Sequence, residues 1–69
     1  MALNEVLKEM RLKAKLTQAA AGAALGVDQT AISQWESGET LPRLERLPSI
    51  AKLYQCTVAD LLSGKQGAV

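Results

Sequence analysis

The chain has 69 residues, 48% of them hydrophobic, and a formal net charge of only +1. This length accommodates one small domain, and the absence of histidine together with a single cysteine argues against zinc-finger, disulfide-stapled and Cys-His catalytic proteins. Apolar runs are too short to span a membrane and the start lacks a secretory-signal pattern, so we expect a cytoplasmic protein that is not an enzyme and holds no metal or cofactor.

The first expected element is an amphipathic helix within residues 3–14. Its apolar positions recur at helical spacing, namely Leu3, Val6, Leu7, Met10 and Ala14. Asn4, or a residue just before it, is the expected N-cap. Basic side chains are expected around the exposed side of this helix, including Lys8, Arg11 and Lys15. Their presence there fits either an attraction to phosphate or a face that is only solvated.

Residues 17–38 show the pattern of two helices joined by a very short turn. The first is expected from about Gln18 to Leu25, with Thr17 as its N-cap and Gly26 in the left-handed conformation that ends it. The second is expected from Gln29 to Ser37, with Asp28 as its N-cap. Because the connection is so short, the two helices must cross steeply, which is the spacing of a helix-turn-helix.

The two helices of this unit have distinct surfaces. Gly22 and its alanine neighbours favour close packing between them. In the second helix Ile32 and Trp35 are predicted to turn inward, Trp35 as core filler or with one edge left for a partner. The opposite face carries polar, uncharged side chains, namely Gln29, Thr30, Ser33 and Gln34. Such a face suits hydrogen bonding to base edges, and the alternative is a face that is only solvated.

The C-terminal half predicts two more helices. The segment 37–42 is turn chemistry, and Pro48 belongs in the first turn of a fourth helix that starts at Leu47 or Pro48. Its expected core positions are Ile50, Ala51 and Tyr54, with Leu44 and Leu47 packing from the incoming loop. A fifth helix follows the capping pair Thr57 and Asp60, contains Val58, Leu61 and Leu62, and ends at Gly64. We expect Cys56 to be a small buried hydrophobe and residues 65–69 to be a frayed tail.

Charge is distributed unevenly along the chain. Residues 1–16 carry four basic and two acidic side chains, residues 17–42 carry three acidic and no basic ones, and residues 43–69 carry four basic and two acidic ones. If this domain binds DNA, phosphate attraction must therefore come from the flanks, while the middle supplies geometry and hydrogen bonds.

Taken together, these motifs resemble the lambdoid phage repressor and Cro family, the xenobiotic-response-element type of helix-turn-helix domain. The resemblance rests on residues 16–18, 24–27, 31–38, Pro42 and 53–62. It implies an all-α fold of five short helices within residues 1–64, with the helix-turn-helix formed by the second and third. It also implies a transcriptional regulator that reads an inverted-repeat operator in double-stranded DNA as a weak homodimer, strengthened on DNA.

Site roles follow from the resemblance and the charge pattern. The base-reading residues are expected to be Gln29, Thr30, Ser33 and Gln34. The DNA-backbone residues are expected to be Gln18, Lys8, Arg11, Lys15, Ser37, Gly38 and Arg43. The dimer interface is expected to involve Leu61 or Leu62, at least one of which we expect to be buried within the monomer. Two departures from the family pattern are Glu39, where relatives often have Lys or Arg, and the run Ala20-Ala21-Gly22. An alternative function is a protein-interaction module, such as an antitoxin or a bridging factor.

Overall fold

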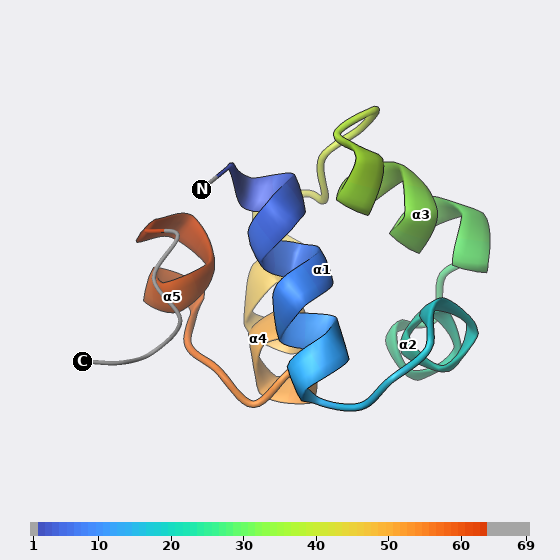
Figure 1. The fold of residues 1–69 in the computed structure, drawn as a ribbon, viewed down its shortest axis with the longest axis horizontal. Helices are drawn as coiled ribbons and strands as arrows, with labels where there is room; N and C mark the ends of the chain where they lie inside the picture. Colours follow the sequence, from blue (N-terminus) through green and yellow to red (C-terminus); the bar gives the residue numbers. More distant parts are fainter. Residues whose placement is uncertain (1, 64–69) are drawn as a thin grey trace.

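The computed structural model describes residues 2–63, and within this range the chain forms five α-helices and one short 3-10 helix (Figure 1). The helices are α1 (Leu3–Lys13), α2 (Gln18–Leu25), α3 (Gln29–Ser37), α4 (Leu47–Leu53) and α5 (Val58–Ser63), and the 3-10 helix η1 (Leu44–Arg46) directly precedes α4. No strand occurs in the described range, so the predicted all-α class is confirmed. The predicted limits of α2 and α3 are also confirmed.

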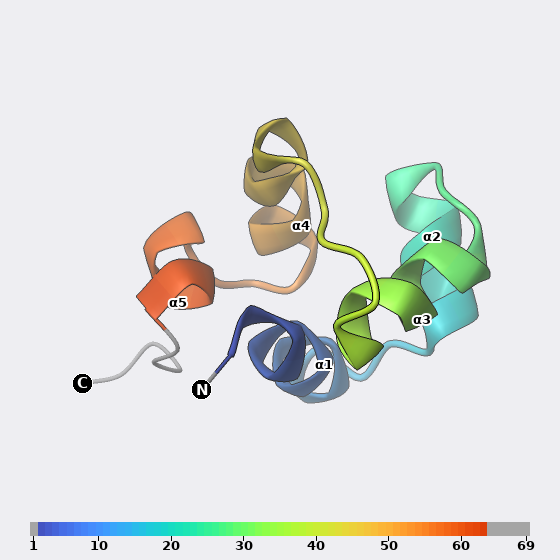
Figure 2. The same ribbon diagram turned by 90° about the horizontal axis from the view of Figure 1, so that it is seen from above.

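Helix α1 lies across the middle of the molecule, with α2 and α3 on one side of it and α5 on the other (Figures 1 and 2). The most extensive packing between helices joins α2 to α3, and α1 also packs on α3. Helix α4 contacts both α2 and α5. The helix-turn-helix unit is therefore held by α1 and α4, while α5 closes the far end of the core.

The core is built from aliphatic side chains with two aromatic ones. Its buried members are Val6, Leu7, Met10, Ala21, Ile32, Trp35, Leu47, Ile50, Ala51, Tyr54 and Leu61. The predicted inward positions of α3 and α4 are thus confirmed. The predicted packing of Leu44 is wrong, because 78% of this residue is exposed. Leu44 lies one turn before the buried Leu47, where η1 carries the chain past the edge of the core.

Four helices end in the same way, with an amide that donates back to the carbonyl five residues earlier. This ending requires one residue in the left-handed conformation. Glycine fills that position after α2 and α3, at Gly26 (φ 73°) and Gly38 (φ 85°), as predicted for Gly26. After α1 and α4 it is filled by Lys15 (φ 61°) and Gln55 (φ 60°), which carry a steric cost that glycine avoids.

The helix starts show which predicted caps form. The Thr17 hydroxyl accepts from the Ala20 amide at 3.0 Å, and Thr57 and Asp60 exchange amide-to-side-chain bonds of 3.1 and 3.0 Å, so both predicted caps are confirmed. Asp28 occupies the N-cap position of α3, but only its backbone carbonyl bonds the helix. Ala2 precedes α1 as its N-cap, so Asn4 lies inside the helix.

Two expectations about the chain's end, a stop at Gly64 and a tail at 65–69, lie outside the described residues. Pro48 lies in the first turn of α4, as predicted. Between residues 2 and 63, no helix has the length and hydropathy needed to cross a bilayer.

Candidate nucleic-acid interface

Helix α3 separates an apolar face from a polar one. On the inner face Ile32 is fully buried and Trp35 is 8% exposed. On the outer face Gln29, Thr30 and Ser33 are exposed and Gln34 is half-buried. Within residues 2–63, none of these four polar side chains forms a hydrogen bond or an ion pair. The hydrogen bonds of these residues involve only their backbone atoms. Their donors and acceptors are therefore available to a partner.

Gly22 sets how closely α2 approaches the start of α3. A Cβ atom added at Gly22 would lie 2.8 Å from the Val27 carbonyl oxygen and 3.2 Å from the Gln29 amide nitrogen. Both distances are shorter than ordinary contact, so only glycine fits at this approach. The close packing predicted from the small residues of α2 is confirmed, and it fixes the start of α3 against α2.

A buried ion pair joins α1 to α3. The Arg11 Nε atom donates to Glu36 Oε2 at 2.6 Å, and Arg11 Nη2 donates to Glu36 Oε1 at 3.0 Å. Arg11 Nη1 also donates to the Leu16 carbonyl at 2.7 Å. The two side chains are only 8% and 4% exposed. This hydrogen-bonded carboxylate raises the pKa of Arg11 above its ordinary value, against an opposing effect of burial.

The prediction that Arg11 lies on an exposed basic face is wrong. Arg11 follows Leu7 by four residues, so it belongs to the buried stripe of α1, and its charge is tolerated there because Glu36 neutralises it. We therefore leave Arg11 out of the DNA-backbone set. Its partner Glu36 was missed, although it follows the buried Ile32 by four residues on α3, and this spacing was the available signal.

Glu36 has two further contacts. Its Oε1 atom accepts from Gln18 Nε2 at 3.1 Å, and its backbone carbonyl accepts from Asn4 Nδ2 at 3.2 Å. Gln18 is the first residue of α2, and it is half-buried. One glutamate therefore ties the start of α2 and two positions on α1 to α3.

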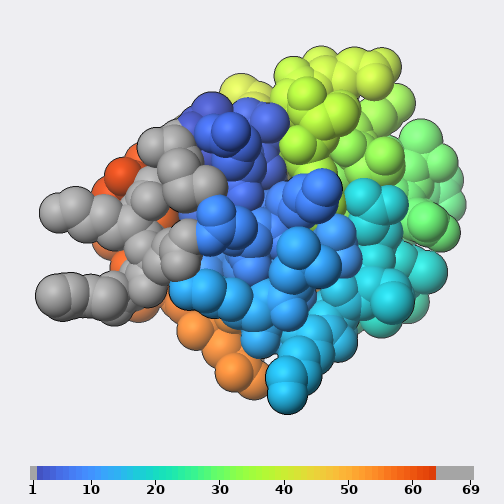
Figure 3. Space-filling model, viewed as in Figure 1, coloured from blue at the N-terminus to red at the C-terminus, as the bar shows by residue number. Residues whose placement is uncertain are grey.

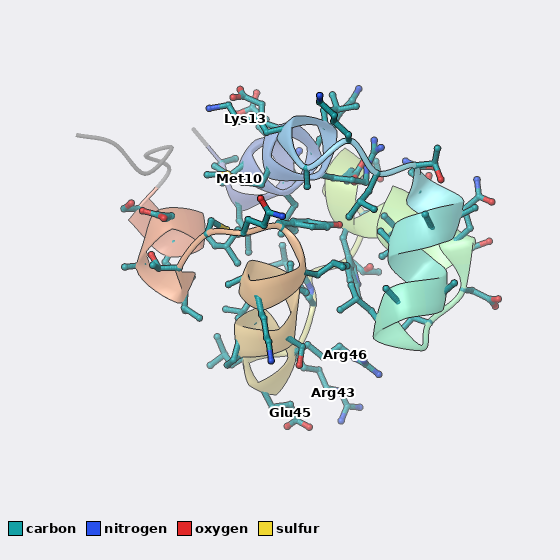
Figure 4. All side chains as sticks on the ribbon, turned by 90° about the horizontal axis from the view of Figure 1, so that it is seen from below. Met10, Lys13, Arg43, Glu45 and Arg46 are labelled. Carbon is teal, nitrogen blue, oxygen red and sulfur yellow. The ribbon has the colours of Figure 1, made fainter. Side chains whose placement is uncertain are left out.

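The ion pair changes the charge map at the surface. With Glu36 neutralised, the exposed acidic residues of segment 17–42 are Asp28 and Glu39. The exposed basic residues of the N-terminal segment are Lys8, which lies midway along α1, and Lys13 and Lys15, which lie at its C-terminal end and just after it. Figure 3 shows that this end of α1 lies beside α2, and that α2 and α3 form one continuous flank of the molecule. The C-terminal end of α1 thus adjoins the helix-turn-helix unit, whereas Lys13 lies on the other side of α1, in a pocket that it lines with Tyr54, Cys56 and Asp60 (Figure 4).

The loop after α3 adds a second polar segment. The Ser37 hydroxyl donates to the Gln34 carbonyl at 3.1 Å, and the Glu39 amide donates to the same carbonyl at 3.0 Å. Ser37, Gly38 and Glu39 are exposed. These bonds hold a tight, solvent-facing loop at the C-terminal end of the polar face.

A groove of about 580 Å³ lies next to this loop, lined by Trp35, Leu41, Pro42, Arg43, Glu45, Arg46 and Ser49. Arg43 is exposed, whereas Arg46 is half-buried and donates from Nη1 to the Leu25 carbonyl at 3.3 Å. Figure 4 shows the two arginines extending on the same side of the molecule. Arg46 therefore caps the end of α2, and Arg43 remains available to a ligand.

The structure separates the two leucines assigned to a dimer interface. Leu61 is completely buried in the monomer core, whereas Leu62 is 59% exposed. The assignment of Leu61 to the interface is therefore wrong, and the expectation that at least one of the pair is buried is confirmed. Of these two leucines, Leu62 is the one that can contribute to an external contact.

Two titratable groups away from this surface are held in their neutral forms. Burial raises the pKa of Tyr54 to about 12, and the Glu36 charge adds to the effect. Burial also raises the pKa of the half-buried Cys56 thiol, with a smaller contribution from Asp60. A thiol that resists ionisation suits the packing role predicted for Cys56.

Comparison with known proteins supports this description. The helix-turn-helix family profile matches residues 7–61. The chain is 42% identical over 66 residues to the HTH-type transcriptional activator BcrR of Enterococcus faecalis, and 44% identical over 62 residues to repressor protein C2 of Salmonella phage P22. These alignments cover 96% and 90% of this chain but only 32% and 29% of the relatives, so the chain spans about a third of their length.

Solved structures give the same result. The P22 c2 repressor in complex with a synthetic operator superposes with a TM-score of 0.85 at 42% identity, covering 94% of this chain and 98% of that one. The solution structure of the DNA-binding domain of the same repressor gives a TM-score of 0.87 at 42% identity, covering 93% and 84%. The chain therefore belongs to the helix-turn-helix family and has the phage-repressor type of fold that its sequence motifs predict.

Proposed function

We propose that this domain binds double-stranded DNA in a sequence-specific manner, with α3 in the major groove, and that it regulates transcription. The observation that carries this proposal is the outer face of α3, which carries four polar, uncharged side chains, three of them exposed and Gln34 half-buried. Among residues 2–63, no hydrogen bond or ion pair engages these four side chains. The likeness to a repressor solved with its operator supports the same docking. A protein-binding surface is instead enriched in aromatic anchors, and this face has none.

Base reading falls to the four side chains of that face. The amide of Gln29 or Gln34 can pair in bidentate fashion with adenine N6 and N7, and the Thr30 methyl can pack on a thymine methyl. The Ser33 hydroxyl can donate or accept. Because these groups lie on a nine-residue helix, about 13 Å long, one copy spans roughly four base pairs.

Backbone contacts fall to the elements that flank α3. The amides of Gln18 and Ala19 have no partner within α2, since the first turn of a helix leaves its N–H groups unpaired. They can therefore donate to a phosphate, together with the Gln18 side chain. The remaining candidates are exposed groups on the segments that precede α2 and follow α3 and at the end of α3, namely Lys8, Lys15, Ser37, Gly38 and Arg43.

A sequence of about four base pairs is too short to specify one site in a long DNA molecule. We therefore propose that two copies of the domain bind an inverted repeat. Half-sites about 34 Å apart place both reading helices on the same face of the duplex. Leu62 supplies an exposed apolar group for contact between copies. So small a surface predicts weak self-association without DNA.

Selection of bound sequences from a random duplex pool tests this proposal. We expect enrichment of an inverted repeat and a complex of two protein chains per duplex in sedimentation analysis. Failure to enrich any sequence, or a one-to-one complex on a site without dyad symmetry, contradicts it.

A further inference from the structure

The contact between Gln18 and Glu36 links the proposed phosphate anchor to a charge buried under the reading helix. Glu36 is 4% exposed in its side chain, and both of its carboxylate oxygens accept from Arg11. The Oε1 atom accepts in addition from Gln18 Nε2 at 3.1 Å. This third bond is not needed to neutralise Glu36, because Arg11 already does so.

An ionised carboxylate only accepts hydrogen bonds, so the end of the Gln18 amide that faces Glu36 must be its NH2 group. One N–H of this group is then fixed inward and the other diverges from it in the amide plane. A phosphate oxygen also only accepts. To bind a phosphate, the Gln18 side chain therefore needs an N–H that points outward. The bond to Glu36 uses one N–H of the amide and leaves the other for the phosphate.

We propose that Glu36 is a positioning residue for DNA binding: it holds the Gln18 amide in the orientation that presents an N–H to a phosphate, and it is itself held by Arg11. This inference rests on the proposed function. Its physical basis is preorganisation, because a glutamine fixed before binding loses less rotamer freedom when phosphate arrives. Arg11 and Glu36 thereby affect DNA affinity without touching DNA.

Proton NMR of the unaltered protein without DNA tests the contact directly. We expect one of the two Gln18 Nε2 protons to be shifted downfield and to exchange more slowly with water than the Nε2 protons of Gln55, which is an exposed glutamine in the same spectrum. Gln18 Nε2 protons that behave like those of Gln55 overturn the inference. This result is independent of whether the protein binds DNA and of whether any variant folds.

The functional consequence is tested by a mutant cycle on the duplex selected from the random pool. In the double variant Arg11→Met/Glu36→Leu, apolar side chains replace the ion pair, a change that folded proteins tolerate when packing is kept. In the parent we expect Gln18→Ala to weaken binding by about 10-fold or more, as for a hydrogen bond to a charged group. In the double variant we expect the same substitution to have an effect about 3- to 10-fold smaller, from the freedom that an ordered side chain loses on binding.

Gln29→Ala is the matched control in both backgrounds, since within residues 2–63 the Gln29 side chain makes no hydrogen bond to Glu36. Its effect on affinity should be the same with and without the ion pair. Equal effects of Gln18→Ala in both backgrounds, or a parallel change in the effect of Gln29→Ala, show that the pair only maintains the fold and overturn the inference. If no duplex is selected at all, the proposed function fails and the NMR measurement alone decides the Glu36–Gln18 contact.

Discussion

Gly22→Ala is expected to destabilise the protein even though alanine is the better helix former. In an exposed helix interior the exchange stabilises by about 1 kcal/mol. Here the new Cβ would lie 2.8 Å from the Val27 carbonyl oxygen, 3.2 Å from the Gln29 amide nitrogen and 3.3 Å from the Asp28 carbonyl carbon. All three neighbours are backbone atoms, so the chain must move to relieve the contact.

Overpacking of this kind costs about 1–3 kcal/mol, and rigid backbone neighbours place Gly22 in the upper part of that range. Subtracting the helix-propensity gain leaves a net loss of about 1–2 kcal/mol. For a domain of this size, each kcal/mol lowers the melting temperature by about 4–8 °C. The displacement also separates α2 from the start of α3, so DNA affinity should fall at temperatures where the variant is folded.

Urea denaturation followed by the fluorescence of Trp35, the single tryptophan, measures this loss. Two controls separate its causes. Ala24→Gly on the exposed side of α2 calibrates helix propensity, and Gly26→Ala places a methyl group in open space at φ +73°, which strains the turn without pushing the helices apart. A Gly22→Ala protein that is more stable than the parent and binds DNA equally well would refute the reasoning.

Three further outcomes are expected. Glu39→Lys should tighten binding to all duplexes and steepen the slope of log K against log salt by about one unit, because it replaces a repulsion by an attraction near phosphate; an unchanged slope in a salt titration would remove the loop from the interface. Gln55→Gly should raise the free energy of unfolding, measured with urea, by about 0.5–1 kcal/mol, since Gln55 has φ 60°, whereas Lys52→Gly within α4 should lower it. The folded-state pKa of Tyr54 of about 12 exceeds its unfolded value near 10, so its contribution to stability is complete below about pH 10 and is lost as pH rises toward 12. Urea denaturation across this range should show that loss in the parent and less of it in Tyr54→Phe; parallel curves would exclude the tyrosine as its cause.

Sequence alone predicted the features that depend on neighbours three to five residues apart. The Thr17 cap, the Thr57 and Asp60 pair and the left-handed Gly26 all form through such short-range bonds. Helical spacing likewise predicted the two faces of α3, because its period assigns Ile32 and Trp35 to one side. The outer face of the candidate site could therefore be predicted before the fold was known.

The buried part of the candidate site could not be predicted from the sequence, because it depends on residue pairs that are far apart in the chain. Arg11 and Glu36 are 25 residues apart, and each taken alone resembles a solvated surface charge. The burial of Leu61 and the exposure of the adjacent Leu62 depend on how α5 meets the core, which the apolar pattern of a six-residue helix leaves open.

We propose that the outer face of α3 reads base edges, and the binding specificity of Gln29→Ala tests this role most directly. The measurement is the ratio of affinities for the selected duplex and a random duplex, with the melting temperature as a control for folding. Gln55→Ala is a matched loss of an exposed glutamine amide outside the helix-turn-helix unit, and it should leave the ratio unchanged. For Gln29→Ala the ratio should fall by about 10- to 100-fold, the value of one bidentate base contact, with little change in melting temperature. An unchanged ratio for a folded Gln29→Ala protein would contradict the account.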